Sequence, residues 1–593
     1  MKNSGLTVYV QHIQYVGQPL DYSKPPSKQK SIDVIGIDTE ADVDGKCFMI
    51  ATSLGDVFTA DSFPACMFTR KYRNTTFVAY NLSYDAGHFI SWLPKTNIRE
   101  LWESGVTEYC DYKIKSIPKK FLRITYKTKN SITFYDMLNF YRGAGIKGGS
   151  SLDSVAENVL GERKISIATK SFTAAYIKRH WNEIAEYCIK DAVLVERLGN
   201  KIIRQFEEWG VHPRALYSTA YITFQYFSRK TRYVTVHRYW YKHKRLLDYA
   251  MQSYNGGKFE VTRKGLGYYY EYDIVSAYPY EIANLIDISK GIVKHSTTYD
   301  PLATYSFLKC IITIPPNVFS PVAIKYGSVN TYPVGRYIKV ITKNEYEYLL
   351  SVGCTLIVID CYSIYTGIRY KPYKEEIERL FEYKKLYKNS GDKLLYHTVK
   401  ILLNSLYGKF VQLIKAGDKM RATTCWNPIY GSIITANTRI RVSRMQQLYP
   451  SIVAVHTDSI ISTSKLDIDV GKELGDWDFE CEGEGVILGS GIYQIGKISK
   501  YRGFRSNVPL VDHLNHKRST KILVSRKAIS WREAAFHHWD IDMINRFITE
   551  NKRLNIRFDK KRIWIKDYKS FHDVKSRNVY SIPYLLDLLD SPC

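Results

Sequence analysis

Acidic residues with short, regular spacing occur in the first 200 positions of the sequence. Two end the run SIDVIGIDTE, and residues two apart on a strand project to the same face. A third follows another apolar run at a strand end, and a phenol and a carboxylate four apart in EYCIKDAV share one helix face. Such oxygen ligands can hold two divalent ions that activate water for phosphodiester hydrolysis. The set consists of Asp38, Glu40, Asp85, Tyr187 and Asp191.

A second acidic pair lies beyond residue 260. Asp273 ends the alternating run YYYEYDIV, and we expect Pro279 in the following SAYP to stop that strand. Asp458 lies between the apolar runs 452–455 and 459–462, so a tight hairpin would hold it near the tip. Two carboxylates on neighbouring strands can hold two magnesium ions, one lowering the pKa of a primer 3′-hydroxyl and one carrying a triphosphate.

A helical hairpin is predicted between these two strands, with arms at 372–388 and 393–407. On the second arm, polar residues separated by seven, four and three positions share one face, while leucines and a valine supply packing on the other. The polar residues are Lys393, Lys400, Asn404 and Tyr407. A solvated charged face would explain the lysines but not NSLYG between two metal-ligand strands, so we interpret this face as a nucleotide grip.

The N-terminal acids resemble, in order, the three exonuclease motifs of the proofreading domain of family B DNA polymerases: D-x-E, N-x-x-x-D and Y-x-x-x-D. The resemblance implies catalysis by the whole acidic set with Tyr187, and metal binding by Asp38, Glu40 and Asp191. It makes Lys164 an auxiliary catalytic lysine. It also implies contacts to single-stranded DNA by Asn81, Tyr84, Ser151 and Leu152.

The later segments resemble the polymerase motifs of the same family: DIVSAYP, KILLNSLYG and, in part, HTDS. The resemblance implies that Asp273 and Asp458 bind the catalytic metals, together with Val275. Lys400 would contact the triphosphate, and Tyr278 would stack under the sugar and exclude a 2′-hydroxyl. The remaining implied nucleotide-binding residues are Ser276, Lys393, Asn404 and Tyr407.

The segment between the two acidic regions looks like the Y-x-G-G motif of the protein-primed branch of the family, and implies DNA contacts by Tyr254, Gly256 and Gly257. A terminal protein is therefore the expected primer; priming by a nucleic-acid 3′ end, or without a primer, is the alternative. Residues 411–427 are shorter than the insertion such enzymes usually carry there, which argues against strong strand displacement.

Two motifs depart from the family pattern. His456 replaces the first carboxylate of D-T-D-S, and a neutral imidazole there could accept a hydrogen bond or touch a metal. We expect retained activity with an altered metal preference. In the K-x-Y primer clamp Tyr493 remains but Gly491 takes the place of the lysine, so we expect Lys500 and Arg502 to grip the primer phosphates.

The composition restricts the class of partner. A net charge of +27 favours a polyanion, with nucleic acid first and an anionic membrane surface second. The ten cysteines form no C-x-x-C pair, which indicates reduced thiols in a cytosol-like compartment. No run approaches the roughly 18 apolar residues of a membrane span. We expect a soluble protein of the host cytoplasm, or of the nucleus or an organelle in a eukaryotic host.

The resemblance implies an α/β and α+β multidomain chain, with a ribonuclease H-like exonuclease followed by a right-hand polymerase of antiparallel palm, helical fingers and thumb. Expected partners are primer-template DNA, deoxynucleoside triphosphates and a terminal protein, with a monomeric chain and two Mg²⁺ per site that Mn²⁺ could replace. The alternatives are a non-catalytic nucleic-acid-binding relic and a nuclease with a decayed polymerase half. The expected divisions are a leader at 1–30, exonuclease at 31–205, a Y-x-G-G connector at 206–260, palm at 261–368 with room for an insertion, fingers at 369–412, palm at 413–482, and thumb with a basic C-terminal region at 483–593.

Overall fold

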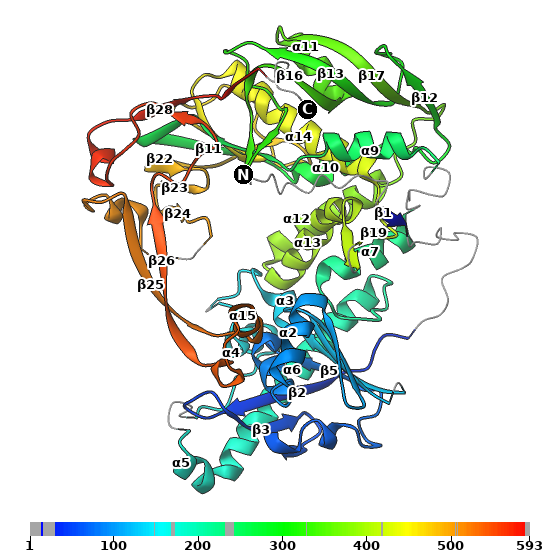
Figure 1. Ribbon diagram of the computed structural model, residues 1–593, viewed down its shortest axis with the longest axis vertical. Coiled ribbons are helices and arrows are strands. Elements are labelled where there is room, and N and C mark those ends of the chain that lie inside the picture. The colour runs from blue at the N-terminus through cyan, green and yellow to red at the C-terminus, as the bar shows by residue number, and fades with distance from the viewer. Residues whose placement is uncertain are drawn as a thin grey trace.

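The computed structural model describes residues 13–15, 30–127, 129–147, 149–167, 172–231, 242–327, 329–416, 419–503, 506 and 508–587. Apart from 13–15 and residue 30, the expected leader lies outside the described residues. Two large sheets occupy opposite ends of the molecule, with helices between them and a long C-terminal hairpin running along one side (Figure 1). No helix among the described residues is long and apolar enough to cross a bilayer.

The N-terminal module, residues 30–208, contains an eight-stranded mixed sheet. β2 lies parallel to β5 and β5 parallel to β9, and the remaining pairs are antiparallel. Across the sheet the strands are β4 (Val57–Thr59), β3 (Cys47–Thr52), β2 (Ile35–Ala41), β5 (Thr76–Ala79), β9 (Asn130–Asp136), β8 (Phe121–Tyr126), β7 (Tyr112–Ile117) and β6 (Val106–Tyr109).

Four helices cover this sheet: α1 (Leu82–Phe89), α2 (Lys95–Ser104), α4 (Leu152–Leu160) and the long α6 (Trp181–Glu208). α6 packs closely on β2, since a Cβ at Gly36 would lie 1.8 Å from the carbonyl oxygen of Ala192. Only glycine permits this approach. The expected domain boundary at 205–206 falls inside α6, because the helix continues for one more turn.

The second large sheet has β11 (Arg263–Ile274) at its centre. The order across it is β10 (Lys258–Val261), β20 (Ile452–Thr457), β21 (Ser459–Ser462), β11, β22 (Trp477–Gly489), β23 (Ile492–Ile495) and β24 (Ile498–Lys500), with β28 (Val579–Ile582) also on β11 and β27 (Ile563–Trp564) on β28. β22 pairs with β11 over nearly its whole length, so the expected boundary at 482–483 divides a strand of this sheet.

Helices link the two sheets. α12 (Lys374–Ser390) and α13 (Lys393–Phe410) form the expected antiparallel hairpin, and α13 packs against α7 (Thr219–Lys230). α14 (Pro428–Leu448) is almost wholly buried beneath α9 (Lys244–Ser253) and α10 (Ala277–Ala283). The short 411–427 segment forms the strands β18 (Leu413–Ala416) and β19 (Lys419–Ala422), and β1 (Ile13–Tyr15) adds to β19 in parallel.

A smaller five-stranded sheet occupies the region where we left room for an insertion. Its order is β12 (Ile292–Ser296), β17 (Thr355–Tyr365), β13 (Tyr305–Ile314), β16 (Val334–Thr342) and β29 (Leu585–Asp587). α11 (Lys343–Ser351) packs on it and also contacts α14. The sheet therefore rests on the same buried helix as the second large sheet.

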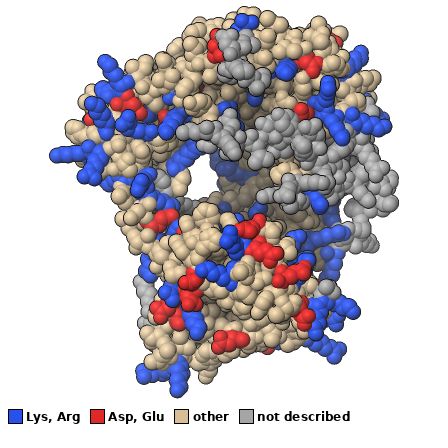
Figure 2. Space-filling model, viewed as in Figure 1, with Lys and Arg blue, Asp and Glu red and all other residues tan. Residues whose placement is uncertain are grey.

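The C-terminal hairpin consists of β25 (Thr520–Ala528), β26 (Phe547–Asn555) and the segment between them, which contains α15 (Trp531–His537). Its two strands extend from the second large sheet towards the N-terminal module (Figure 1). In the space-filling view an opening passes through the molecule, with Lys and Arg side chains on its wall (Figure 2).

Candidate functional site

The first cluster, here called the N-terminal centre, is built on the end of β2. Asp38 and Glu40 lie together as predicted, and one ligand atom from each lies within 4.8 Å of the other and of the Cys188 sulfur on α6. The Cys188 thiol also points at Asp38, with Sγ 3.8 Å from Oδ2. The sequence analysis missed Cys188, although it lies three residues before Asp191 and therefore on nearly the same helix face.

Asp191 completes this centre from α6. Its Oδ2 forms an ion pair with Lys164, whose Nζ lies 4.8 Å from the centre of the Tyr187 ring, so the structure brings these three predicted residues together. Burial lowers the pKa of Lys164, but Asp191 and then Tyr187 outweigh it and raise that pKa above its ordinary value. The Oδ1 atom of Asp191 is buried without a hydrogen-bond partner among the described residues, which suits a cation ligand.

Asp85 lies elsewhere than predicted, in α1 rather than at the end of a strand. β5 ends at Ala79, and Asn81 reverses the chain with a left-handed φ of 67° before the helix begins. Asp85 Oδ1 accepts a 2.7 Å hydrogen bond from Thr39, the residue between the two acids of β2. Asp136, which the sequence analysis missed, holds the turn by accepting from the Asn81 N–H at 2.9 Å.

The electrostatics of this centre favour a bound cation. Burial first, and neighbouring carboxylates second, raise the pKa of Asp38 well above its usual range and that of Glu40 to about 8. Burial likewise raises the pKa of Asp85 to about 7. Lys164 pairs directly with this cluster through Asp191. The carboxylate oxygens of the cluster are hard ligands, which suit divalent ions.

The expected DNA contacts Ser151 and Leu152 have structural roles here. Ser151 is the N-cap of α4, where its hydroxyl accepts from the Ser154 N–H at 3.2 Å. The Leu152 side chain is 8% exposed and packs in the core with Val155. Ser151 therefore lies at the surface, whereas Leu152 is buried because it begins the apolar face of α4.

The second centre joins β11 to the β20–β21 hairpin. Asp273 lies opposite Ser459, and the Ile274 N–H donates to the Asp458 carbonyl at 3.0 Å. Asp458 occupies the predicted tight turn, whose other residue, Thr457, has a φ of 71°. The two carboxylates line a cavity of about 680 Å³ together with Val275, Ser276, Lys400 and Asn404.

Charged groups in this cavity differ in part from those expected. Lys384 of α12 lines it and donates to the Ser276 hydroxyl at 2.8 Å, and Glu480 of β22 lines it as a further acid. Burial, with Lys400 second, lowers the pKa of Lys384 to about 8. Lys393 lies outside this cavity and lines a neighbouring one, because seven residues before Lys400 are two turns or ~10 Å along the helix.

The acids of the second centre are buried more moderately. Burial, and then Asp458, raise the pKa of Asp273 to about 7. Burial raises the pKa of Asp458 to about 6 against the lowering effect of Lys400. A pair of protonatable buried acids beside lysines fits a divalent ion together with an anionic ligand.

Two tyrosines form one wall of this region. The Tyr278 and Tyr407 ring centres are 4.3 Å apart and their planes 46° apart, so the structure brings these two predicted residues together. The strand before Tyr278 ends through the left-handed φ of 52° at Ser276, and Pro279 lies in the first turn of α10, so the proline begins a helix rather than stopping the strand. The Val275 carbonyl accepts from the Gly475 N–H at 2.9 Å, which leaves its second lone pair for a metal.

The Y-x-G-G segment is fixed against the second centre. A Cβ at Gly257 would lie 2.4 Å from Thr457 Cγ2, so glycine lets the connector approach the turn that carries Asp458. Arg439, fully buried in α14, donates to the Asn255 carbonyl at 2.6 Å and the Gly256 carbonyl at 3.0 Å. Its Nη2 atom forms an ion pair with Glu345 at 2.7 Å. The sequence analysis missed Arg439, because α14 also carries Arg441 and Arg444 and no local pattern separates the three.

His456 has become part of an aromatic stack. Its ring lies 4.8 Å from Tyr493 at 14° and 4.7 Å from Phe259, and Nε2 accepts from the Gly491 N–H at 3.3 Å. Burial, and then Lys561, lower its pKa to about 3, so the ring is neutral near pH 7 with its proton on Nδ1. The predicted hydrogen-bond acceptor is thus observed. Nδ1 itself is buried without a partner among the described residues.

Steric crowding accounts for the glycine at position 491 of the altered K-x-Y motif. Gly491 has a φ of 74°, and a Cβ there would lie 3.1 Å from the Phe259 ring and 3.3 Å from Arg502 Cβ. A lysine at 491 would crowd both side chains and would strain the left-handed backbone. The Arg502 guanidinium and the Lys561 amine approach the same Phe259 ring, 5.0 and 4.6 Å from its centre. The Tyr493 hydroxyl donates to Glu271 at 2.7 Å.

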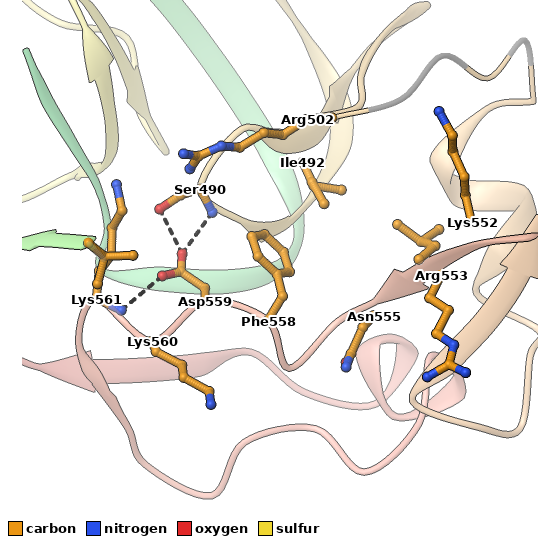
Figure 3. A pocket seen from close by; sticks show the side chains of 13 residues that line it. Ser490, Ile492, Arg502, Lys552, Arg553, Asn555, Phe558, Asp559, Lys560 and Lys561 are labelled. Carbon is orange, nitrogen blue, oxygen red and sulfur yellow. Dashed lines mark hydrogen bonds between the residues drawn. The ribbon is translucent and has the colours of Figure 1, made fainter. Parts of the chain in front are cut away.

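A basic pocket of about 530 Å³ adjoins this stack (Figure 3). Its cationic lining comes from Arg502, Lys552, Arg553, Lys560 and Lys561. Asp559 orders the pocket by accepting from the Ser490 N–H at 2.8 Å and the Ser490 hydroxyl at 2.7 Å, and from the backbone N–H of Lys561 at 3.2 Å. Lys500 lines the adjacent cavity with His456 and Asp458. These cations suit a phosphate backbone.

Comparison with known families supports the resemblance. Residues 156–423 match the family model described as DNA polymerase type B, organellar and viral. No curated protein sequence matches the chain. The resemblance to family B DNA polymerases, predicted from the motifs, is thereby confirmed over residues 156–423.

Solved structures show the same overall fold. Phi29 DNA polymerase complexed with primer-template DNA and incoming nucleotide substrates has a TM-score of 0.62 at 16% identity, covering 89% of this chain and 100% of that one. The post-translocation binary complex with primer-template DNA gives the same values. The orthorhombic crystal form gives a TM-score of 0.57 at 17% identity, covering 78% of this chain and 87% of that one. The chain therefore has a multidomain α/β fold shared with that polymerase.

Proposed function

We propose that the chain is a DNA-dependent DNA polymerase that also edits its product with a 3′–5′ exonuclease. The observation that carries the polymerase assignment is the cavity between β11, the β20–β21 turn and α13. It combines Asp273 and Asp458 with Lys400 and Lys384. Acids beside several lysines suit a triphosphate with its divalent ions better than any neutral substrate.

In this proposal the chain's own groups position both substrates. Divalent ions bound at Asp273 and Asp458 would lower the pKa of the primer 3′-hydroxyl and stabilise the departing pyrophosphate. Lys400 and Lys384 neutralise triphosphate oxygens from the helical side. Tyr278, backed by Tyr407, lies under the sugar and leaves no room for a 2′-hydroxyl.

The editing role rests on the N-terminal centre. Asp38, Glu40 and Asp191 hold the metals, and Asp85 is their neighbour on α1. Bound ions there would supply an activated water. Lys164 and Tyr187 lie beside Asp191, where a cation and a phenol can orient that water or the scissile phosphate.

The subdomain assignment follows the sheets. We assign 31–208 to the exonuclease, the second large sheet with β22–β24 to the palm, and α12–α13 to the fingers. The C-terminal hairpin and the basic pocket belong to the thumb. The pocket lies beside β23, so it suits the backbone of the duplex leaving the palm (Figure 3).

A terminal protein is the proposed primer, and its hydroxyl would enter the second centre in place of a primer 3′ end. The support is the Y-x-G-G connector, which Arg439 and Gly257 fix against the Asp458 turn. Incubation with labelled deoxynucleotide and the terminal protein of the same genome should give a covalent protein–nucleotide band. Extension of a DNA primer without such a band would restrict the enzyme to nucleic-acid primers.

The polymerase assignment is tested with purified protein, a primed template, labelled deoxynucleotides and either Mg²⁺ or Mn²⁺. We expect template-directed extension with deoxynucleotides and little with ribonucleotides, and Tyr278→Val should admit ribonucleotides. A wild-type chain that binds the primed template but extends it with neither metal would be the non-catalytic relic. One that only shortens the primer would be a nuclease with a decayed polymerase half.

A further inference from the structure

The tip of the C-terminal hairpin is docked on the N-terminal module. Residues 529–546, between β25 and β26, contribute Ile529, Trp531, Ala534, Ala535 and Ile544 to a core that otherwise belongs to that module. Trp102 of α2 contacts Phe536 edge-on, with ring centres 5.5 Å apart. In Figure 1, α15 lies beside the N-terminal module while the strands of its hairpin reach towards the second large sheet.

Asn545 makes a buried polar contact at this junction, whereas the pairs Lys95–Asp540 and Arg99–His538 join the tip to α2 at the exposed surface. Asn545 is 1% exposed, and its Nδ2 donates to the Tyr84 carbonyl of α1 at 3.0 Å, 461 positions away in the sequence. The same amide lies 3.1 Å from Nε2 of His88. Burial lowers the His88 pKa to about 4, so its neutral ring can accept that bond near pH 7. The Tyr84 and His88 rings stand edge to face at 4.9 Å.

The backbone around this contact allows little adjustment. Asn545 has a left-handed φ of 67°, which asparagine adopts more readily than most residues, and its N–H donates to the Ile529 carbonyl at 2.8 Å. A Cβ at Gly87 would lie 2.7 Å from Ile544 and 3.0 Å from the Asn545 amide. Both sides of the junction are therefore shaped for close contact.

We propose that Asn545 is a positioning residue for the N-terminal centre: through it the C-terminal hairpin fixes α1, the helix that carries Tyr84 and Asp85. This inference rests on the proposed editing role of that centre. It follows that the element gripping duplex DNA in the polymerase half also holds part of the editing site in place. A rearrangement of the hairpin would change editing without touching Asp38 or Glu40.

The test replaces Asn545 by glycine, which keeps the left-handed backbone and removes only the amide. Asn551→Gly, at an exposed position of β26 in the same hairpin, is the matched control. For Asn545→Gly we expect a ~10-fold lower kcat for degradation of single-stranded DNA with KM within twofold, because a misplacement of about 1 Å can cost that much or more. Primer extension should stay within twofold of wild type. An equal loss of both activities would show a general structural defect and overturn the inference.

Two further measurements do not depend on nuclease activity. Hydrogen exchange of the α1 amides should rise at least tenfold in Asn545→Gly but not in Asn551→Gly, with the second large sheet unchanged. Mn²⁺ affinity, measured in an Asp273→Asn background so that the N-terminal centre dominates, should fall several-fold. If the wild type degrades no DNA, the editing proposal fails while these two readouts still decide the inference. Unchanged α1 exchange and Mn²⁺ affinity would overturn it.

Discussion

The two acidic centres of this chain both suit divalent ions, but the charged groups around them differ. In the N-terminal centre, acids gather around one directly paired lysine and a thiol, and the pKa values of the carboxyl groups rise as far as about 8. In the second centre, Asp273 and Asp458 share a cavity with further acids such as Glu480 and with several lysines, and a neutral His456 replaces a carboxylate of the family motif. A site that must hold metals against a diester needs concentrated negative charge. A site that must also receive a triphosphate needs cations beside its metals.

The sharpest contrast within the second centre is between two lysines of α13. Lys400→Ala should raise the KM for deoxynucleotides by ~100-fold, because a charge-assisted contact to a triphosphate is worth about 1.5–3 kcal/mol. Lys393→Ala, two turns away and outside the cavity that contains the two acids, should change it less than threefold. Steady-state extension of a primed template measures both. Equal effects would mean that α13 presents one continuous nucleotide face, as the sequence alone suggested.

The basic pocket offers a proposed DNA contact that the N-terminal centre does not share. Lys560→Ala, at an exposed lysine of the pocket, should weaken primer-template binding ~3–10-fold and reduce the slope of log affinity against log salt by about 0.9, the value for one phosphate contact. Single-strand degradation should keep its rate. Lys569→Ala, an exposed lysine outside the pocket, is the control. An unchanged salt slope would remove Lys560 from the DNA interface.

The preference between Mg²⁺ and Mn²⁺ tests whether replacing the family carboxylate by His456 affects metal binding. His456→Asp should keep extension within about tenfold of wild type and shift the preference between Mg²⁺ and Mn²⁺ towards Mg²⁺, since a hard oxygen replaces an imidazole. The nearby Lys561 and Arg502 can compensate the new charge. The ratio of extension rates in the two metals is the readout. The same ratio in both proteins would mean that residue 456 does not influence metal binding.

Because the acids of the N-terminal centre are more deeply buried than those of the second centre, we expect the stability of the protein to depend on pH. Bound metal ions should reduce this dependence. Glu40 and Asp85 bind protons more tightly folded, with pKa values of about 8 and 7, than unfolded. Their contribution without metal is therefore greatest below about pH 4, where the unfolded chain is also protonated, and is lost as pH rises through 7 to 8. Mn²⁺ should raise the melting temperature by a few degrees, more at pH 8 than at pH 6. Asp38→Asn with Glu40→Gln should flatten this dependence more than Asp273→Asn.

The features that could be predicted from the sequence are those that depend on short-range patterns. The strand ends at Asp38 and Asp273, the turn at Asp458 and the α12–α13 hairpin follow from alternation, helix spacing and turn residues within one segment. Asp85 was misplaced because a left-handed Asn81 starts a helix immediately after a strand. Lys393 lies outside the cavity of the two acids because sharing a helix face says nothing of distance along the axis, and its nucleotide contact stays a prediction.

Residues that act across the chain could not be found in this way. Lys561 reaches Phe259 from a segment about 300 positions away, and Arg439 fixes the connector from inside a buried helix. Asn545 looks like an ordinary hairpin residue until its contact with α1 is seen. Such contacts depend on how the sheets and the C-terminal hairpin pack, which no local pattern encodes.

We propose that one chain holds two separate metal-dependent centres, and a crossed pair of substitutions tests this most directly. Asp273→Asn should lower primer extension about 1000-fold or more while leaving single-strand degradation near wild type, because a lost metal ligand removes several kcal/mol of transition-state stabilisation. Asp38→Asn should do the reverse. We expect this crossed pattern in one assay with Mg²⁺ or Mn²⁺, and loss of both activities in either variant would contradict the presence of two separate centres.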